Sequence, residues 1–269
     1  MVRPRKKFDL RKTLFLLPNM ITLSSVFCGF DSIRISATAK SDADFRAAAL
    51  LLIFAMFFDI LDGRVARMTK TQSAFGLQID SLADVVSFGV APALLVYQWS
   101  LHRLDLLGLI GAFVFVACGA VRLARFNVLS MGESGQPAKP SKYIVGLPIP
   151  GAASILMSIV LANHAAGTDL GSARFSSIIL AVTLALSFFM VSTVRFRSFK
   201  DVKLDGRAAA FVAFMGASSM AISSVFKPAF VLVWLLAVYV MIGVGETTLD
   251  LMRRVVTARR ESFDEPPAS

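Results

Sequence analysis

Four aspartates lie inside apolar blocks that are long enough to cross a lipid bilayer. They belong to two segments, DILDGRVAR at residues 59–67 and GLQIDSLAD at residues 76–84. A charged side chain at bilayer depth costs about 2.5–3.5 kcal/mol on insertion scales. Four such charges in one hairpin require a cationic partner, so the chain must fold in a way that brings one among them.

The apolar blocks predict the fold class. Hydrophobic residues make up 56% of the 269 residues and charged residues 17%, which is less charge than a soluble domain usually carries. A helix needs about 20 apolar residues to cross the bilayer core. The pattern therefore predicts an all-α, polytopic integral membrane protein with about eight transmembrane helices. We expect them at 16–37, 46–67, 76–97, 105–127, 149–165, 173–193, 207–222 and 228–248.

The distribution of Lys and Arg predicts the orientation. Most of the 28 basic residues fall on one side if the spans alternate, and basic loops stay in the cytoplasm. We therefore expect a basic cytoplasmic N-terminus at 1–13, one transmembrane domain at 14–250 and a disordered cytoplasmic tail at 251–269. The net charge is +10, and we expect the basic residues to face the anionic lipid headgroups of the cytoplasmic membrane. We expect no nucleic acid as a partner.

The spacing of the aspartates predicts one cluster. Asp59 and Asp62 share a helix face, as do Asp80 and Asp84, because offsets of three and four residues point the same way. Folding the two helices antiparallel about the turn brings Asp59 level with Asp84 and Asp62 level with Asp80. All four carboxylates can then converge.

Converging carboxylates repel one another unless cations bind between them. Oxygen-only ligands favour Mg²⁺, Mn²⁺ or Ca²⁺ over Zn²⁺, and a pair of such ions suits phosphoryl chemistry. Gly63, Ala66 and Gly76 leave the helix faces bare for a ligand, and Arg67 offers a fork for phosphate. Two alternatives remain: a structural hairpin in which Arg64 and Arg67 pair with the acids, and a divalent-cation transporter.

The complete pattern resembles the signature of the CDP-alcohol phosphotransferases. Its eight fixed positions are all filled, at the spacing Asp-x₂-Asp-Gly-x₂-Ala-Arg-x₈-Gly-x₃-Asp-x₃-Asp. Residues 17–23, 122–127 and 146–150 are similar to the membrane-bound phosphatidylserine synthase branch of that family. Ile149 departs from the branch, because a small or polar residue is expected between Pro148 and Pro150.

The resemblance implies roles for particular residues. Two divalent cations, Mg²⁺ or Mn²⁺, would be held by Asp59, Asp62, Asp80 and Asp84, with Asp84 also the general base. The substrates would be CDP-diacylglycerol and L-serine. The donor would contact Asn19, Thr22, Gly63, Ala66, Arg67, Ser73 and Gly76.

The acceptor site rests on fewer residues. A serine carboxylate needs a cation, and Arg122 and Arg125, one turn apart near the end of an expected span, are the candidates. Glycerol 3-phosphate, an inositol phosphate or choline are alternative acceptors for the same chemistry. The family also implies a homodimer, and the distribution of Lys and Arg predicts that the active site and both termini face the cytoplasm.

Overall fold

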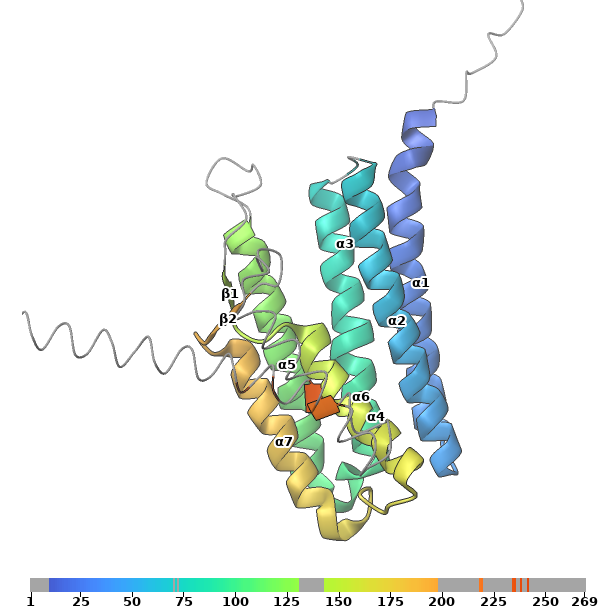
Figure 1. Ribbon diagram of the computed structural model, residues 1–269, viewed down its shortest axis with the longest axis vertical. Helices are drawn as coiled ribbons and strands as arrows, with labels where there is room; N and C mark the ends of the chain where they lie inside the picture. Colours follow the sequence, from blue (N-terminus) through green and yellow to red (C-terminus); the bar gives the residue numbers. More distant parts are fainter. Residues whose placement is uncertain are drawn as a thin grey trace, which may run out of the picture.

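The helices of the protein run back and forth along one common direction (Figure 1). The computed structural model describes residues 10–69, 71, 73–130 and 143–197, with 218, 219, 234, 235, 238 and 241. The long helices are α1 (Leu10–Thr38), α2 (Asp42–Met68), α3 (Ala74–Asp84), α4 (Ala91–Trp99), α5 (Asp105–Ser130), α6 (Ile149–Ala166) and α7 (Ala173–Val191). These helices lie where the first six spans were predicted, with α3 and α4 together in the place of the third. The predicted spans at 207–222 and 228–248, and the terminal segments 1–9 and 251–269, lie outside the described residues except at the isolated positions above.

Four of the described stretches are long and apolar enough to cross a membrane. They are Ala74–Trp99, Leu101–Leu129, Ile149–Ala166 and Ala173–Val191. Helices α1 and α2 are as long, with 29 and 27 residues, but carry polar and charged side chains within their apolar stretches. The chain is thus a helical membrane protein, and the total of about eight spans stays a prediction.

Helices α3 and α4 form one continuous rod through a π-helical segment, Val85–Val90. Pro92 lies at the start of α4 and has no N–H to donate to the preceding turn. The wider π turn accommodates this, and the N–H of Ala91 bonds to the carbonyl of Val86, five residues back. Such π turns occur often at functional sites, and this one begins directly after Asp84.

The π-helical segment packs closely against α1. The Ser87 hydroxyl donates to the backbone carbonyl of Ser25 over 3.1 Å, and both serines are buried. A Cβ added at Gly29 would lie 2.8 Å from the Cα of Ser87, so glycine is required for this approach. Since the aspartates of α3 directly precede the segment, this contact fixes their height relative to α1.

Ile149 is fully buried at the start of α6 and fills the space between two glycines. A Cβ at Gly119 on α5 would lie 2.5 Å from its Cδ1 atom, and one at Gly89 would lie 3.6 Å away. A small or polar residue, which we expected here, would leave this space unfilled. The large apolar side chain is matched by the two bare glycine surfaces that face it.

One short ribbon adds to the otherwise helical fold. β1 (Tyr143–Val145) pairs antiparallel with β2 (Arg195–Arg197), next to the start of α6 and the end of α7. Aromatic and β-branched residues in these segments favour extended backbone. The all-α fold class predicted from the sequence is confirmed for the described residues, with these two strands of three residues as a small addition.

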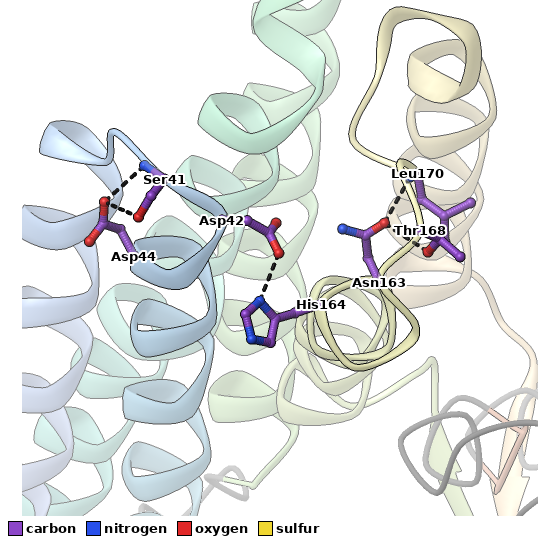
Figure 2. A network of polar contacts seen from close by, with 7 residues as sticks. All are labelled: Ser41, Asp42, Asp44, Asn163, His164, Thr168 and Leu170. Carbon is purple, nitrogen blue, oxygen red and sulfur yellow. Dashed lines mark hydrogen bonds and ion pairs between the residues drawn. The ribbon is translucent and has the colours of Figure 1, made fainter.

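Hydrogen bonds join the helices at the end that holds the α1–α2 turn (Figure 2). Nδ1 of His164 on α6 lies 2.7 Å from Oδ2 of Asp42 on α2. Oδ2 of Asp44 accepts from the N–H and the hydroxyl of Ser41, both at 2.9 Å, which caps the start of α2. Asn163 holds the α6–α7 loop by accepting from the N–H of Leu170. These contacts anchor α2 and α6 far from the aspartates.

Candidate metal-dependent active site between α1, α2 and α3

Carboxylates from two helices meet at one place. Asp59 and Asp62 lie on α2 and Asp80 lies on α3, and each offers an oxygen within 4.8 Å of the other two. Asp84 continues the cluster, because its carboxyl group lies close to that of Asp59 and interacts electrostatically with that of Asp80. The four carboxylates thus converge, as the sequence predicts.

The backbones of α2 and α3 do not pack tightly against each other. Helix α2 packs mainly on α1 and α6, and α3 packs mainly on α1 and on the π-helical segment. The two acid-bearing helices therefore meet through their side chains rather than through their backbones. A ligand between them would face carboxylates from both sides.

The surroundings of Asp62 fit a bound cation. Its side chain is only 4% exposed, and it lies next to the side chain of Thr22 and the backbone of Gly63. Its Oδ2 atom is buried without a hydrogen-bond partner. A buried carboxylate oxygen normally has a partner, and a hard divalent cation supplies one. The oxygen-only donor set of Asp59, Asp62 and Asp80 fits Mg²⁺ or Mn²⁺.

Arg67 bends back over its own helix. A Cβ added at Gly63 would lie 3.5 Å from its Nη1 atom, so the guanidinium covers the glycine surface and interacts electrostatically with Asp62. The rest of the Arg67 residue is exposed. A guanidinium that lies over a glycine surface therefore borders the carboxylates on α2. Ala66, one residue earlier, is half-buried, and its carbonyl accepts from the N–H of Thr71 in the turn.

Asn19 on α1 approaches the first turn of α3. Its Oδ1 atom would lie 3.8 Å from a Cβ added at Gly76, which joins two residues predicted to contact the same ligand. Ser73 has a structural role: its hydroxyl accepts from the N–H of Gly76 over 3.0 Å and caps α3. Thr22, one turn along α1, bonds to the Pro18 carbonyl over 3.1 Å.

The two candidate acceptor residues differ. Arg122 on α5 is half-buried and interacts electrostatically with Asp84. Arg125 is exposed, and within the described part of the chain it makes no hydrogen bond or ion pair with the carboxylates. Arg122 therefore lies beside the cluster and Arg125 does not.

Several residues near the cluster escaped the sequence analysis. Asn127 on α5 donates to the hydroxyl of Ser81 on α3 over 2.9 Å, and Gln78 accepts from the same amide over 3.4 Å. The polar residues of the block at 122–127 were a signal, because Asn near the end of an apolar span needs a partner. No local pattern indicated which residue that partner is.

A pocket of about 600 Å³ lies at the opposite end of the helices. Its lining comes from the α1–α2 turn, from Trp99, His102 and Arg103, and from the α6–α7 loop. None of the four clustered aspartates contributes to it. The chemistry of the carboxylates, rather than the volume of this pocket, defines the candidate site.

These observations define a helical membrane protein with a partly buried carboxylate centre suited to divalent cations. Residues 15–191 match the model of the CDP-alcohol phosphatidyltransferase family, a range that runs from α1 to the end of α7. The chain belongs to this family.

Several proteins of known name are similar in sequence to this chain, and each of the three described next is named for a lipid with a serine headgroup. A CDP-diacylglycerol–serine O-phosphatidyltransferase of Helicobacter pylori is 38% identical over 71% of this chain and 75% of its own length. An enzyme of the same name from Bacillus subtilis is 33% identical over 68% of this chain and 91% of its length. An archaetidylserine synthase of Methanothermobacter thermautotrophicus is 36% identical over 70% and 72%.

Proposed function

We propose that this protein transfers the phosphatidyl group of CDP-diacylglycerol to the hydroxyl of L-serine, forming phosphatidylserine and CMP. The observation that carries the proposal is the meeting of Asp59, Asp62 and Asp80 oxygens within 4.8 Å, in a chain of the CDP-alcohol phosphatidyltransferase family. The names of the relatives support serine as the acceptor. The archaeal relative is named for a different lipid but the same headgroup.

The carboxylates would hold two divalent cations. Asp59, Asp62 and Asp80 are assigned to one, and Asp59, Asp80 and Asp84 to the other. Such ions neutralise pyrophosphate oxygens and the charge that develops on a departing CMP. The unpartnered Oδ2 atom of Asp62 supports this assignment.

The remaining residues bind and orient the donor. Arg67 would pair with the donor's phosphates, and the bare faces of Gly63 and Gly76 would admit the nucleotide. Asn19 and Thr22 on α1 would line its other side. The closeness of Asn19 to Gly76 and of Thr22 to Asp62 supports one continuous binding surface. Ala66 and Ser73 would border it.

The acceptor would attack directly. Asp84 would remove the proton from the serine hydroxyl while that oxygen bonds to the β-phosphorus, and the bond from phosphorus to CMP would break. Arg122, beside Asp84, would bind the serine carboxylate and so hold the hydroxyl near the base. Arg125 is the weaker candidate because it is exposed.

The placement in the membrane belongs to the same proposal. We infer about eight spans, of which α1 and α2 are two, in the cytoplasmic membrane. Both termini and the carboxylates would face the cytoplasm, since basic loops stay on that side. The protein would act as a homodimer.

Purified protein in detergent–lipid micelles, supplied with CDP-diacylglycerol and Mn²⁺, tests the proposal. We expect radiolabelled serine to enter lipid, and glycerol 3-phosphate or inositol phosphate to react at least tenfold more slowly. Faster transfer to either of those acceptors would reject serine. Ion flux through proteoliposomes without transfer would reject the enzyme altogether.

The Asp84→Asn variant tests the base. We expect turnover to fall by about 10²–10⁴-fold while CDP-diacylglycerol still binds. Asp31→Asn is the matched control, because within the described part of the chain Asp31 pairs with Arg34 alone, on the same helix, at 2.7 Å. An active Asp84→Asn enzyme would reject the assignment of the base.

A further inference from the structure

A pair of polar side chains joins α3 to α5 next to the carboxylates. The amide nitrogen of Asn127 donates to the Ser81 hydroxyl over 2.9 Å, and that hydroxyl lies 3.1 Å from Oδ1 of the same amide. Both residues are half-buried. The contact connects positions 46 residues apart in the chain, so it reports how the two helices are arranged relative to each other.

Apolar packing does not hold this end of α5. Its last-turn residues Phe126, Val128 and Leu129 are 47%, 74% and 63% exposed. Farther along, α5 packs on the π-helical segment, on α4 and on α7, and less on α3. Apolar side chains that face lipid gain little by association, whereas hydrogen bonds between helices hold them together. Among the described residues, the Ser81–Asn127 pair is therefore the main tie at this end.

The same two helices meet again at the candidate site. Ser81 directly follows Asp80 and stands three residues before Asp84, and Asn127 stands five residues after Arg122. Arg122 interacts electrostatically with Asp84. At 1.5 Å per residue the two contacts on α5 are about 7.5 Å apart. A shift of the end of α5 would thus move Arg122 relative to Asp84.

We propose that Ser81 and Asn127 are positioning residues that set the affinity for the acceptor by holding Arg122 against the carboxylate cluster. The inference rests on the proposed function, since it assumes that the acceptor binds between α5 and Asp84. Most donor residues lie on α1 and α2, which the pair does not join, so the pair acts mainly on the acceptor. Ser81 and Asn127 do not touch the substrates.

Kinetics of Ser81→Ala, Asn127→Ala and the double variant test the proposal. We expect each single change to raise the KM for serine about 3- to 20-fold, the range that one interhelical hydrogen bond supports. The KM for CDP-diacylglycerol should change less than twofold. The double variant should be no worse than the singles. Ser24→Ala is the control, since among the described residues its hydroxyl bonds to the Met20 carbonyl of its own helix alone.

Exchanging the partners provides a rescue. The variant Ser81→Asn with Asn127→Ser restores an amide–hydroxyl pair across the same two helices. We expect its KM for serine to return to within threefold of the wild type. Equal increases in both KM values, additive single effects, or a failed rescue would each overturn the proposal.

A distance measurement makes the test independent of the acceptor. Spin labels at Phe75 on α3 and Val128 on α5, both exposed, report the separation of the helix ends after Cys28 and Cys118 are replaced by alanine. We expect Ser81→Ala to broaden the distance distribution. An unchanged distribution would overturn the positioning role even if serine proves to be the acceptor. A broadened one together with no serine transfer would reject only the proposed function.

Discussion

Replacing Asp62 by asparagine should stabilise the metal-free protein while it abolishes activity. Asparagine has nearly the same shape and fits the same place beside Thr22 and Gly63. It removes one negative charge from a cluster whose three oxygens lie within 4.8 Å of one another. The two effects have opposite signs, which a general folding defect cannot produce.

The structure sets the size of the effect. Two unit charges 4.8 Å apart repel by about 3.5 kcal/mol at an effective dielectric constant of about 20. Asp62 has two such neighbours, Asp59 and Asp80, so the full repulsion is about 7 kcal/mol. Solvent ions and side-chain relaxation relieve most of it. We therefore expect about 1–3 kcal/mol of added stability in the metal-free state, which is of the size of a large single-mutation effect.

Thermal unfolding in detergent, with EDTA and with Mn²⁺, measures both effects. The wild type should gain stability from Mn²⁺, because a ligand that binds only the folded state raises Tm. Asp62→Asn should raise Tm in EDTA and lose most of the gain from Mn²⁺. Asp31→Asn, which removes one ion pair on α1, should keep the full gain. An Asp62→Asn protein that is destabilised in EDTA, or that keeps the whole Mn²⁺ response, would refute the reasoning.

Three further substitutions separate binding from folding. Gly63→Ala places a Cβ 3.5 Å from the Arg67 guanidinium, which is an ordinary contact, so Tm should not fall. The KM for CDP-diacylglycerol should rise about tenfold, and an unchanged KM would remove Gly63 from the donor site. Gly29→Ala places a Cβ 2.8 Å from the Cα of Ser87 and should cost about 1–3 kcal/mol of stability by overpacking. A lower Tm would measure this loss, and a wild-type Tm would show that α1 can move away from Ser87 freely. Ile149→Ala should cost about 2–5 kcal/mol through the cavity it opens, and a smaller loss would show that the helices close around it.

The helices and the hairpin of aspartates could be predicted from the sequence. Apolar blocks of about 20 residues mark membrane helices because backbone groups in lipid must bond within their own segment. The offsets 59, 62 and 80, 84 put each pair of carboxylates on one helix face, and the short turn brings the helices together. The i, i+3 pairing of Asp31 with Arg34 follows from the same periodicity.

The contacts among α1, α3, α5 and α6 could not be predicted in this way. The π turn after Asp84 depends on Pro92 and on the approach of Gly29 to Ser87. The match of Ile149 with its two facing glycines needs three segments in place at once. Each was invisible to an analysis of one segment at a time.

By itself the sequence determined where the helices of the first six predicted spans lie, roughly how long they are, and which carboxylates share a face. These follow from the rise and period of a helix, which act over a few residues. Only the tertiary structure decided that Arg122 stands beside Asp84 and Arg125 does not, and that Asn127 reaches Ser81. Such contacts depend on the rotation and distance of whole helices, and those are set by the sum of many packing interactions that no single stretch of residues contains.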